Sequence, residues 1–326
     1  VQIAVDEYNG SRDSIFQARL ERGDTGGTPE GAAAVAGAAA STERLIGVVG
    51  PLRIEQAAAA APMLGEAGIP TLIPSVTEVS LGSAGWTSYR RLVADDRRQG
   101  MALGAEAARR ARRGLIGAKA AIVHDESPSG ASFAEGAREA LQDARVEVAR
   151  FEAARGNVDY RALGAAITRD PPGAVLHGGS GERAGALLAG LRAAGFQGSF
   201  LASREAHDSR FMDWAGGAGA GAETVCACAD PGDPSLREFA GAHLRRFSAP
   251  PAPYAVEAYE GTLMLLEAIQ EVEARPREVA GFFRSAPVFL GMSKSYSFDD
   301  GGEVASAPVW LYRFKEGVWR WAGRST

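Results

Sequence analysis

The sequence predicts an α/β protein built from two doubly wound, Rossmann-like lobes. Short apolar runs alternate with helix-length segments twice along the chain, which is typical of parallel sheets covered by helices on both faces. The chain has 326 residues, 46% of them hydrophobic, which is enough for two cores. Turn-rich segments at residues 114–118 and 229–233 interrupt this rhythm. We expect them to be hinges between the lobes.

The clearest β-α-β unit spans residues 45–77. The apolar runs LIGVVG and IPTLIP flank a helix-length segment, so we expect a buried parallel strand on each side of a helix. Arg53 lies shortly after the first strand, and Ser75, Val76 and Thr77 follow the second. Because ligands bind beyond the carboxyl ends of parallel strands, these two strand ends are expected to form one wall of a binding cleft.

The remaining elements follow from local patterns. Asn9-Gly10 ends a helix at the start of the chain, and Thr28 followed by Pro29 begins an Ala-rich helix. Apolar and polar residues alternate from Phe16, which predicts a strand. The predicted strands are 15–21, 45–49, 69–74, 89–93, 120–123, 146–151, 174–179, 199–203 and 224–227, and the predicted helices are 1–8, 28–41, 51–68, 95–113, 132–143, 160–168, 182–194, 235–247 and 254–274. From Val288 onward, alternating aromatic and polar residues around Glu316-Gly317 predict hairpins.

Composition excludes several classes of partner. The net charge of −5 and the pI near 5.6 argue against a nucleic-acid ligand. No apolar run of about 18 residues occurs, so we expect no membrane span in this chain. Its first residues also lack the charged and apolar pattern of an export signal, so we expect that any such signal was removed or never present.

The two cysteines, Cys226 and Cys228, fall in a predicted strand. Residues two apart in a strand lie about 7 Å from each other and point the same way, which disfavours a disulfide. We therefore expect two buried, small apolar side chains. A CxC pair without a nearby His or second Cys pair also lacks a metal ligand set.

The sequence favours no enzyme class. His124 and Asp125 are adjacent, so they point to opposite faces of a strand and do not form a catalytic pair. His177 ends another buried run, but no GxSxG elbow or HxxxH spacing accompanies these residues. The GGSGERAG segment departs from the dinucleotide glycine spacing. We predict no catalytic residue, no metal and no cofactor.

Seven segments in order resemble one protein family. They read VVGP, AGIPTLIPSVT, YRRLVADDRRQG, KAAIVHDESPSGASFAEG, LHGGSGERAGALLAGLRAAGF, YAVEAYEGTLMLLEAI and YSFDDGGEVASAPVWLYRF. In this order, over nearly the whole chain, they resemble periplasmic solute-binding proteins of the leucine/isoleucine/valine-binding type. The resemblance implies a type I periplasmic binding fold, in which two lobes joined by three crossovers close on a ligand.

The resemblance also implies boundaries and a setting. Lobe 1 is expected at residues 1–116 and 231–288, and lobe 2 at 117–230 and 289–326. The crossovers would lie near 114–118, 229–233 and 287–291. Family members deliver their ligand to a membrane transporter, so the expected partner is the permease of an ABC transporter, and the expected location is periplasmic or otherwise extracytoplasmic.

The resemblance places ligand contacts at the ends of several strands. The expected positions are Arg53 in the loop after Gly50, Ser75, Val76 and Thr77, Ser129 before Gly130, Ser180 after Gly179, and Arg204 with Glu205 after Leu201. In the family, the first two loops hold an α-carboxylate. Ser129 and Ser180 stand where relatives often carry aromatic residues. The carboxylate that binds the ligand ammonium aligns with Arg204, and Glu205 is its neighbour.

Two ligand classes follow from these positions. If Arg53 and Arg204 both point into the cleft, they favour an anion such as an aromatic acid or a dicarboxylate; otherwise both lie solvated at its rim. If Glu205 turns inward, an amino acid with a free ammonium fits. We favour a branched-chain type amino acid on the resemblance. A ligand-sensing receptor or regulator of the same fold is the alternative to transport.

The start of the chain carries a further expectation. Relatives begin with a strand that precedes a helix resembling VQIAVDEYNG, and strands of such sheets are ordered 2-1-3-4-5. The missing strand would lie between residues 15–20 and 45–49. We therefore expect a longer mature protein or another segment in that position, unless these two strands pair directly.

Overall fold

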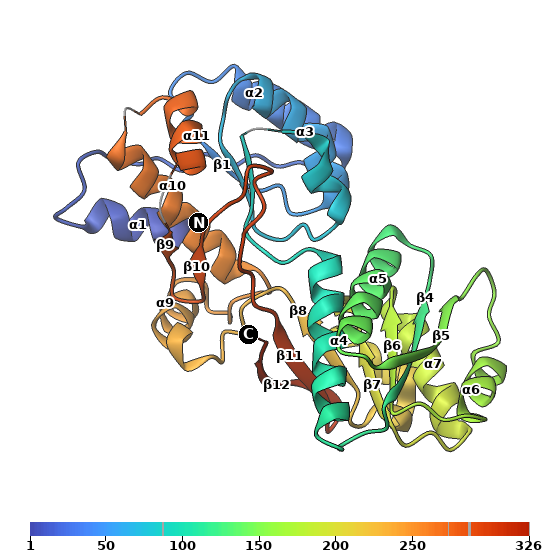
Figure 1. Cartoon of the computed structure of the whole chain (residues 1–326). Coiled ribbons are helices and arrows are strands. Elements are labelled where there is room, and N and C mark those ends of the chain that lie inside the picture. Colours follow the sequence, from blue (N-terminus) through green and yellow to red (C-terminus); the bar gives the residue numbers. More distant parts are fainter. Residues whose placement is uncertain (87, 273, 286–287, 326) are drawn as a thin grey trace. The chain divides into compact units, whose positions relative to one another are not determined.

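The computed structural model describes residues 1–86, 88–272, 274–285 and 288–325 (Figure 1). The chain divides into two compact units. Unit 1 comprises Val1–Ala94 and Cys228–Ala307, and unit 2 comprises Asp95–Ala227 and Pro308–Thr326. These boundaries differ from the predicted lobe boundaries, because the helix after Asp95 lies in unit 2 and residues 289–307 lie in unit 1. Pro287 of the predicted third crossover lies outside the described residues.

Unit 2 contains a 7-stranded sheet in the order β12-β11-β8-β7-β6-β4-β5. Its parallel strands are β4 (Lys119–His124), β5 (Glu147–Ala153), β6 (Ala174–Gly178), β7 (Ser199–Ala202) and β8 (Glu223–Cys226). Counted along the chain, these five strands have the order 2-1-3-4-5 of flavodoxin-like sheets. The strand order therefore reverses between β4 and β6, the position where such sheets bind ligands.

Helices cover both faces of this sheet (Figure 1). They are α4 (Asp96–Arg112), α5 (Pro128–Asp143), α6 (Tyr160–Thr168), α7 (Gly181–Ala193) and α8 (Phe211–Ala215). Val123 of β4, Val175 of β6 and Phe200 of β7 belong to one core cluster, together with Leu187 of α7. Every residue of β6 is buried, as expected for a parallel strand covered on both faces.

Helices α4 and α5 approach each other at glycines. A Cβ atom added to Gly100 of α4 would lie 2.0 Å from the carbonyl oxygen of Phe133 in α5. At Gly136 of α5 a Cβ atom would lie equally close, 2.0 Å from the carbonyl oxygen of Arg97. Asp95 caps α4 by accepting a hydrogen bond from the N–H of Arg98 at 2.7 Å.

The C-terminal residues complete the unit 2 sheet. β11 (Trp310–Lys315) and β12 (Val318–Arg324) form an antiparallel hairpin, and β11 pairs with β8. Gly317 in the turn has a φ of +79°, which glycine adopts without strain. The hairpin predicted around Glu316-Gly317 is therefore confirmed.

The main parallel sheet of unit 1 has fewer strands than the sheet of unit 2. It consists of β1 (Val48–Val49), β2 (Thr71–Ile73) and β3 (Tyr89–Arg91), and β9 (Phe289–Leu290) pairs with β10 (Ser295–Tyr296). The α-helices of unit 1 are α1 (Gln2–Gly10), α2 (Pro29–Ala40), α3 (Ile54–Glu66), α9 (Arg237–Phe247), α10 (Ala255–Glu271) and α11 (Pro276–Ser285). Leu72, Leu92, Met264 and Phe283 belong to one of its core clusters. Thr28 caps α2 at the predicted position.

Short 3₁₀ helices connect several of these elements. They span Val79–Ala84, Arg204–Ala206, Gly216–Gly219 and Pro234–Leu236.

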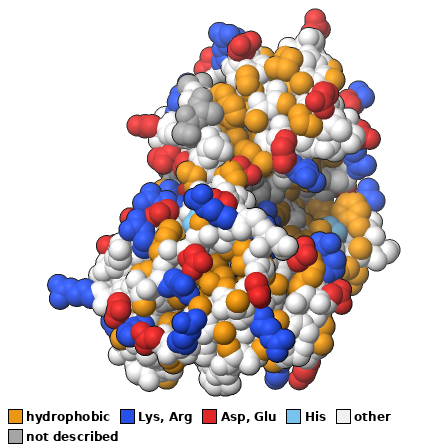
Figure 2. Space-filling view, turned by 90° about the vertical axis from the view of Figure 1, so that its right-hand side faces the viewer, with side chains coloured by type: hydrophobic (Ala, Val, Ile, Leu, Met, Phe, Trp, Pro, Cys, Tyr) orange, Lys and Arg blue, Asp and Glu red, His pale blue; other side chains and the backbone are white. Residues whose placement is uncertain are grey.

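The surface shown in Figure 2 carries side chains of both charges, with Lys and Arg interspersed among Asp and Glu. This face presents no uniformly basic area, in keeping with the acidic net charge.

Two sequence-based expectations about backbone geometry are wrong. Residues 15–21 form no strand; instead, the Asn9 side chain accepts from the Ala18 N–H at 2.8 Å and donates to the Ala18 carbonyl at 2.8 Å. The Asn9 amide thus satisfies the backbone groups of Ala18 that a partner strand would have paired.

The expected gap between residues 15–20 and 45–49 is a separate matter. β1 pairs with β2, and the described structure pairs residues 15–20 with neither strand. The prediction that other residues precede Val1 stays a prediction.

The cysteine prediction is also wrong. Cys226 and Cys228 are both disulfide-bonded, and since the chain has two cysteines, they are bonded to each other. The separation of about 7 Å applies only where both residues belong to one extended strand. β8 ends at Cys226, however, and the backbone bends at Ala227 and Cys228. Both side chains are buried, as predicted.

His177 is fully buried and is the second-to-last residue of β6. Burial lowers its pKa to about 4, the Asp125 carboxylate acts in the opposite direction, and His124 and Arg183 lower it further. Neither ring nitrogen has a hydrogen-bond partner among the described residues. The side chain is therefore neutral at pH 7.

We expect Gly100→Ala to lower the free energy of unfolding by about 1 to 3 kcal/mol, because the new methyl group meets backbone rather than a flexible side chain. Gly241→Ala in α9 is the matched control. Its Cβ atom would meet the mobile end of Arg245 at 3.3 Å, so the gain in helix propensity should leave stability equal or higher. Urea denaturation of both variants checks this. Equal destabilisation in the two would contradict tight packing at Gly100.

We expect the free energy of unfolding to fall as the pH drops from 6.5 to 4. The folded-state pKa of His177, about 4, lies below the unfolded value of 6.5, so the unfolded chain binds the extra proton first in this range. The loss would reach about 3 kcal/mol at most. His177→Leu should flatten this slope, leaving the smaller contribution of His124, whose pKa is also lowered by burial. An unchanged slope in urea denaturation of the variant would refute the assignment.

Candidate ligand-binding site

Polar groups gather in unit 2 where the strand order reverses. The chain leaves β4 through residues 125–127, leaves β6 through Gly179 and Ser180, and leaves β7 through Ser203. Because these strands are parallel neighbours, the three loops meet at one edge of the sheet. We call the residues Asp125, Ser129, Ser180, Ser203 and Glu205 the unit 2 cluster.

Asp125 joins two of these loops. One of its carboxylate oxygens accepts from the N–H and the hydroxyl of Ser127 at 3.1 and 2.6 Å, and the other accepts from the N–H of Ser180 at 2.6 Å. Burial raises the pKa of Asp125, but these hydrogen bonds outweigh burial and lower it. Asp125 is therefore an anion whose oxygens already have donors, and it holds the loops after β4 and β6 together.

Glu205 faces the first residues of α5. Its carboxylate accepts from the Ser129 hydroxyl at 3.3 Å and from the Ser203 hydroxyl at 2.7 Å. The Arg204 guanidinium lies 3.6 Å from the same carboxylate, and the exposed fraction of the Glu205 side chain is 24%. Two predicted residues from different strand ends, Ser129 and Glu205, are thus brought together, and Glu205 keeps an accessible side.

Ser203 contacts both the loop after β6 and the Glu205 carboxylate. Its hydroxyl accepts from the Gly179 N–H at 3.0 Å and lies within hydrogen-bonding distance of the Gly179 carbonyl and of Glu205. The residue is buried, with 3% of its surface exposed. A buried serine that binds both the neighbouring loop and the carboxylate fixes the Glu205 rotamer.

The other predicted residues of unit 2 are less enclosed. Ser180 is exposed, and its hydroxyl accepts from the Arg183 N–H at 3.4 Å as the N-cap of α7. Arg204 has 37% of its side chain exposed and is paired with Glu205. Ser180 is therefore the member of the cluster that caps a helix, and part of the Arg204 charge is balanced by its neighbour.

In unit 1 the loops after β1 and β2 are also linked. The Ser75 hydroxyl donates to the Leu52 carbonyl at 2.8 Å, so the two strand ends predicted to form one wall are in contact. Val76 and Thr77 are buried. Arg53 is the N-cap residue of α3, with 69% of its side chain exposed and its Nε 3.8 Å from the Glu55 carboxylate. Ser75 would have to exchange Leu52 for a ligand oxygen in order to donate to it.

Two members of the unit 2 cluster, Ser203 and Asp125, are not among the predicted site residues. Ser203 is the first polar residue after the SFLA run, a position that could have marked it. Asp125 directly follows β4, and its carboxylate contacts the loop after β6 rather than pairing with the adjacent His124. Both were accessible to the same rule that identified Ser75, namely that polar residues directly after a parallel strand face the ligand edge.

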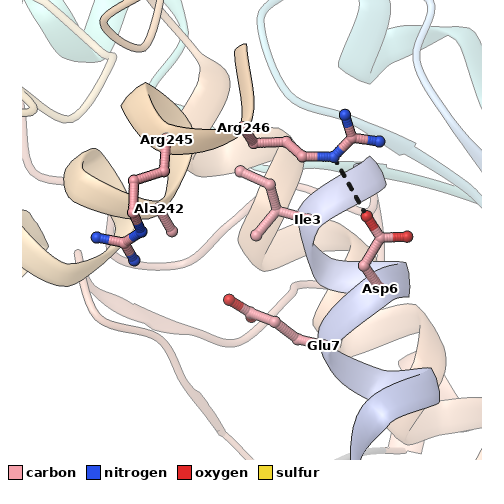
Figure 3. Close-up of a pocket in the computed structure, with 6 residues that line it drawn as sticks. All are labelled: Ile3, Asp6, Glu7, Ala242, Arg245 and Arg246. Carbon is pink, nitrogen blue, oxygen red and sulfur yellow. Dashed lines mark ion pairs between the residues drawn. The ribbon is translucent and has the colours of Figure 1, made fainter. Parts of the chain in front are cut away.

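One pocket of about 300 Å³ lies elsewhere, between α1 and α9 of unit 1 (Figure 3). Asp6 and Arg246 form an ion pair of 3.7 Å across it, and Ile3, Glu7, Ala242 and Arg245 complete its lining. It contains none of the predicted site residues.

Within the described ranges, no group of three His, Cys, Asp or Glu side chains is placed to hold a metal ion. No helix in the part of the chain that the structure covers is long and apolar enough to cross a membrane.

Comparison with known proteins places this architecture. A curated relative is the leucine-, isoleucine-, valine-, threonine- and alanine-binding protein of Pseudomonas aeruginosa, which is 25% identical over 275 residues, 84% of this chain and 72% of the relative. Among solved structures, an ABC transporter substrate-binding protein from Desulfitobacterium hafniense in complex with Leu has a TM-score of 0.82 at 19% identity, covering 98% of this chain and 93% of that one.

A second solved structure carries a different ligand. The solute-binding protein of an ABC transporter from R. palustris, in complex with benzoate, has a TM-score of 0.68 at 18% identity, covering 99% of this chain and 89% of that one. At such identities the likeness shows the fold, and it confirms the predicted type I periplasmic binding architecture. Residues 1–318 match the family model described as periplasmic binding protein. The chain therefore belongs to the periplasmic binding protein family, a class of binding proteins rather than enzymes.

Proposed function

We propose that this protein is an extracytoplasmic solute-binding protein that captures an amino acid of the branched-chain type for uptake by an ABC transporter. The observation that carries the proposal is the Glu205 carboxylate, which is held by Ser129 and Ser203 at the edge where the unit 2 strand order reverses. An ionised carboxylate with an accessible side is the group expected for a ligand ammonium.

The charges of the unit 2 cluster favour a cationic group. Asp125 and Glu205 bring two carboxylates to this edge, and Arg204 brings one guanidinium. The Asp125 oxygens are occupied by backbone and hydroxyl donors, so Glu205 is the acceptor that remains accessible. An ammonium has three N–H donors and no acceptor, which suits Glu205 together with the hydroxyl oxygens beside it.

The carboxylate end of such a ligand would use the loop at Ser75, Val76 and Thr77 in unit 1. A hydroxyl can donate to a carboxylate, and Ser75 already donates to a carbonyl oxygen, Leu52, at 2.8 Å. The exchange replaces a neutral acceptor by a charged one, which forms a stronger hydrogen bond.

The relatives and the disulfide support the setting. The Pseudomonas aeruginosa relative is named for binding leucine, isoleucine, valine, threonine and alanine, and the Desulfitobacterium hafniense structure contains Leu. The Cys226–Cys228 disulfide is typical of proteins in oxidising compartments, which include the bacterial periplasm. The expected partner is the permease of the transporter.

A second candidate ligand is an aromatic acid without an ammonium. The benzoate complex of the R. palustris neighbour favours it, as do the two arginines predicted near the site. Both arginines, however, lie next to a glutamate: Arg53 beside Glu55 at 3.8 Å and Arg204 beside Glu205 at 3.6 Å. An anion would have to compete with these carboxylates, so we rank this ligand class second.

We expect L-leucine, L-isoleucine or L-valine to raise the melting temperature of the protein by several degrees. At a hundredfold excess over the Kd, binding adds about 2.7 kcal/mol to the free energy of unfolding. Benzoate, succinate and buffer alone are the comparison in the same thermal-shift screen. Stabilisation by benzoate or succinate, with no response to amino acids, would replace the amino-acid proposal by the anion one.

The role of Glu205 can be tested separately. We expect Glu205→Gln to weaken L-leucine binding by at least about 30-fold, because the neutral amide leaves a desolvated ammonium without its counter-charge. Glu182→Gln is the matched control, since Glu182 is an exposed glutamate in the first turn of α7 in the same unit. Isothermal titration calorimetry measures both. Equal affinities of Glu205→Gln and Glu182→Gln for L-leucine would exclude Glu205 as the ammonium site.

A further inference from the structure

We propose that the buried ion pair between Arg91 and Glu303 positions the ligand-binding loop of unit 1, residues 75–78, and thereby sets its affinity for ligand. The link to affinity rests on the proposed function, whereas the link to loop position does not. Neither residue is among the predicted ligand contacts. Both are positioning residues that act through the backbone of the loop.

The first observation is the geometry of the pair. Arg91 is the last residue of β3, and its side chain is 1% exposed. Its Nε lies 2.8 Å from one Glu303 carboxylate oxygen, and its Nη2 lies 3.0 Å from the other. This is the two-pronged geometry that only a guanidinium offers to a carboxylate. A charge so deeply buried requires such a partner, because desolvation without one is very costly.

The second observation is what the remaining nitrogen of Arg91 binds. Nη1 donates to the carbonyl of Val76 at 3.0 Å and to the carbonyl of Glu78 at 2.8 Å. These two residues flank Thr77, so a single guanidinium group contacts the loop on both sides of a predicted ligand contact. The loop thus takes its position from a rigid group at the end of the neighbouring strand.

The third observation is that Glu303 is itself held firmly. The Arg91 N–H donates to the Gly302 carbonyl at 2.8 Å, and Glu303 forms a parallel bridge with Arg91. The Glu303 N–H donates to the Asp299 carboxylate at 2.9 Å, and the Tyr89 hydroxyl donates to the Glu303 carboxylate at 3.2 Å. The turn at residues 299–303, more than two hundred positions along the chain, therefore holds the arginine that holds the loop.

These contacts separate two consequences of breaking the pair. Glu303→Gln keeps the size of the side chain and one carbonyl oxygen but removes the negative charge. Arg91 then lacks its counter-charge in a buried site and is driven to shift or to admit water. Arg91→Lys keeps a positive charge near Glu303 but loses the planar fork, so one ammonium cannot reach both the carboxylate and the two carbonyls in the same geometry.

The test combines hydrogen–deuterium exchange of the ligand-free protein with calorimetric titration of L-leucine. We expect both Glu303→Gln and Arg91→Lys to accelerate amide exchange in residues 75–78 and to raise the Kd for L-leucine, each by roughly tenfold. Exchange in β2 and in α10 should change far less than exchange in the loop. Glu21→Gln is the control, because it removes an exposed ion pair of unit 1, with Arg19, at 2.7 Å. It should alter neither measurement.

The outcomes are separable. Uniform acceleration of exchange throughout unit 1 in both variants would mean that the pair only stabilises the fold, and the positioning proposal would be overturned. Unchanged loop exchange would overturn it as well. If the wild type does not bind L-leucine, the proposed ligand is wrong, while the exchange measurement still decides whether Arg91 positions the loop. Faster loop exchange with an unchanged Kd would confine the pair to loop order and would remove it from ligand binding.

Discussion

A buried charge must be satisfied by fixed partners, and in this protein that constraint positions loops that follow the strands. Arg91 is buried at the end of β3 and satisfies its donors with Glu303 and with carbonyls of the 75–78 loop. The arrangement costs desolvation, which is regained only when the partners are correctly placed. Loop position is therefore linked to the burial of one guanidinium, rather than left to the loop sequence.

The same principle operates elsewhere in each unit. In unit 2, Asp125 accepts hydrogen bonds from two loops and so joins the strand ends on either side of the order reversal. In unit 1, Glu257 of α10 is fully buried, accepts from the Ala229 N–H at 2.8 Å, and lies 3.4 Å from Lys294 Nζ. Burial raises the pKa of Glu257, and Lys294 opposes this. The Glu257 carboxylate thus holds the segments near residues 229 and 294 against one helix.

The repeating elements could be predicted from sequence because their signals are local. A fully buried run such as AVLHG and a cap such as Thr28 before Pro29 each specify their own conformation. The failures have distant causes. Residues 15–21 alternate like a strand, but the Asn9 side chain captures the backbone of Ala18 instead. Cys228 lies beyond the last residue of β8, and where a strand ends depends on its partner strand.

The candidate site was predictable from sequence only in part, for the same reason. Strand ends are readable from sequence, so Ser75, Ser129 and Glu205 could be placed beyond the carboxyl ends of parallel strands. Their hydrogen bonds are not readable, because Ser129 meets Glu205 across 76 residues and Ser75 donates to a backbone carbonyl that carries no side-chain signal. The group that fixes Glu205 is not readable from the sequence either. The adjacent Arg204 approaches its carboxylate only to 3.6 Å, whereas the Ser129 and Ser203 hydroxyls donate to it at 3.3 and 2.7 Å.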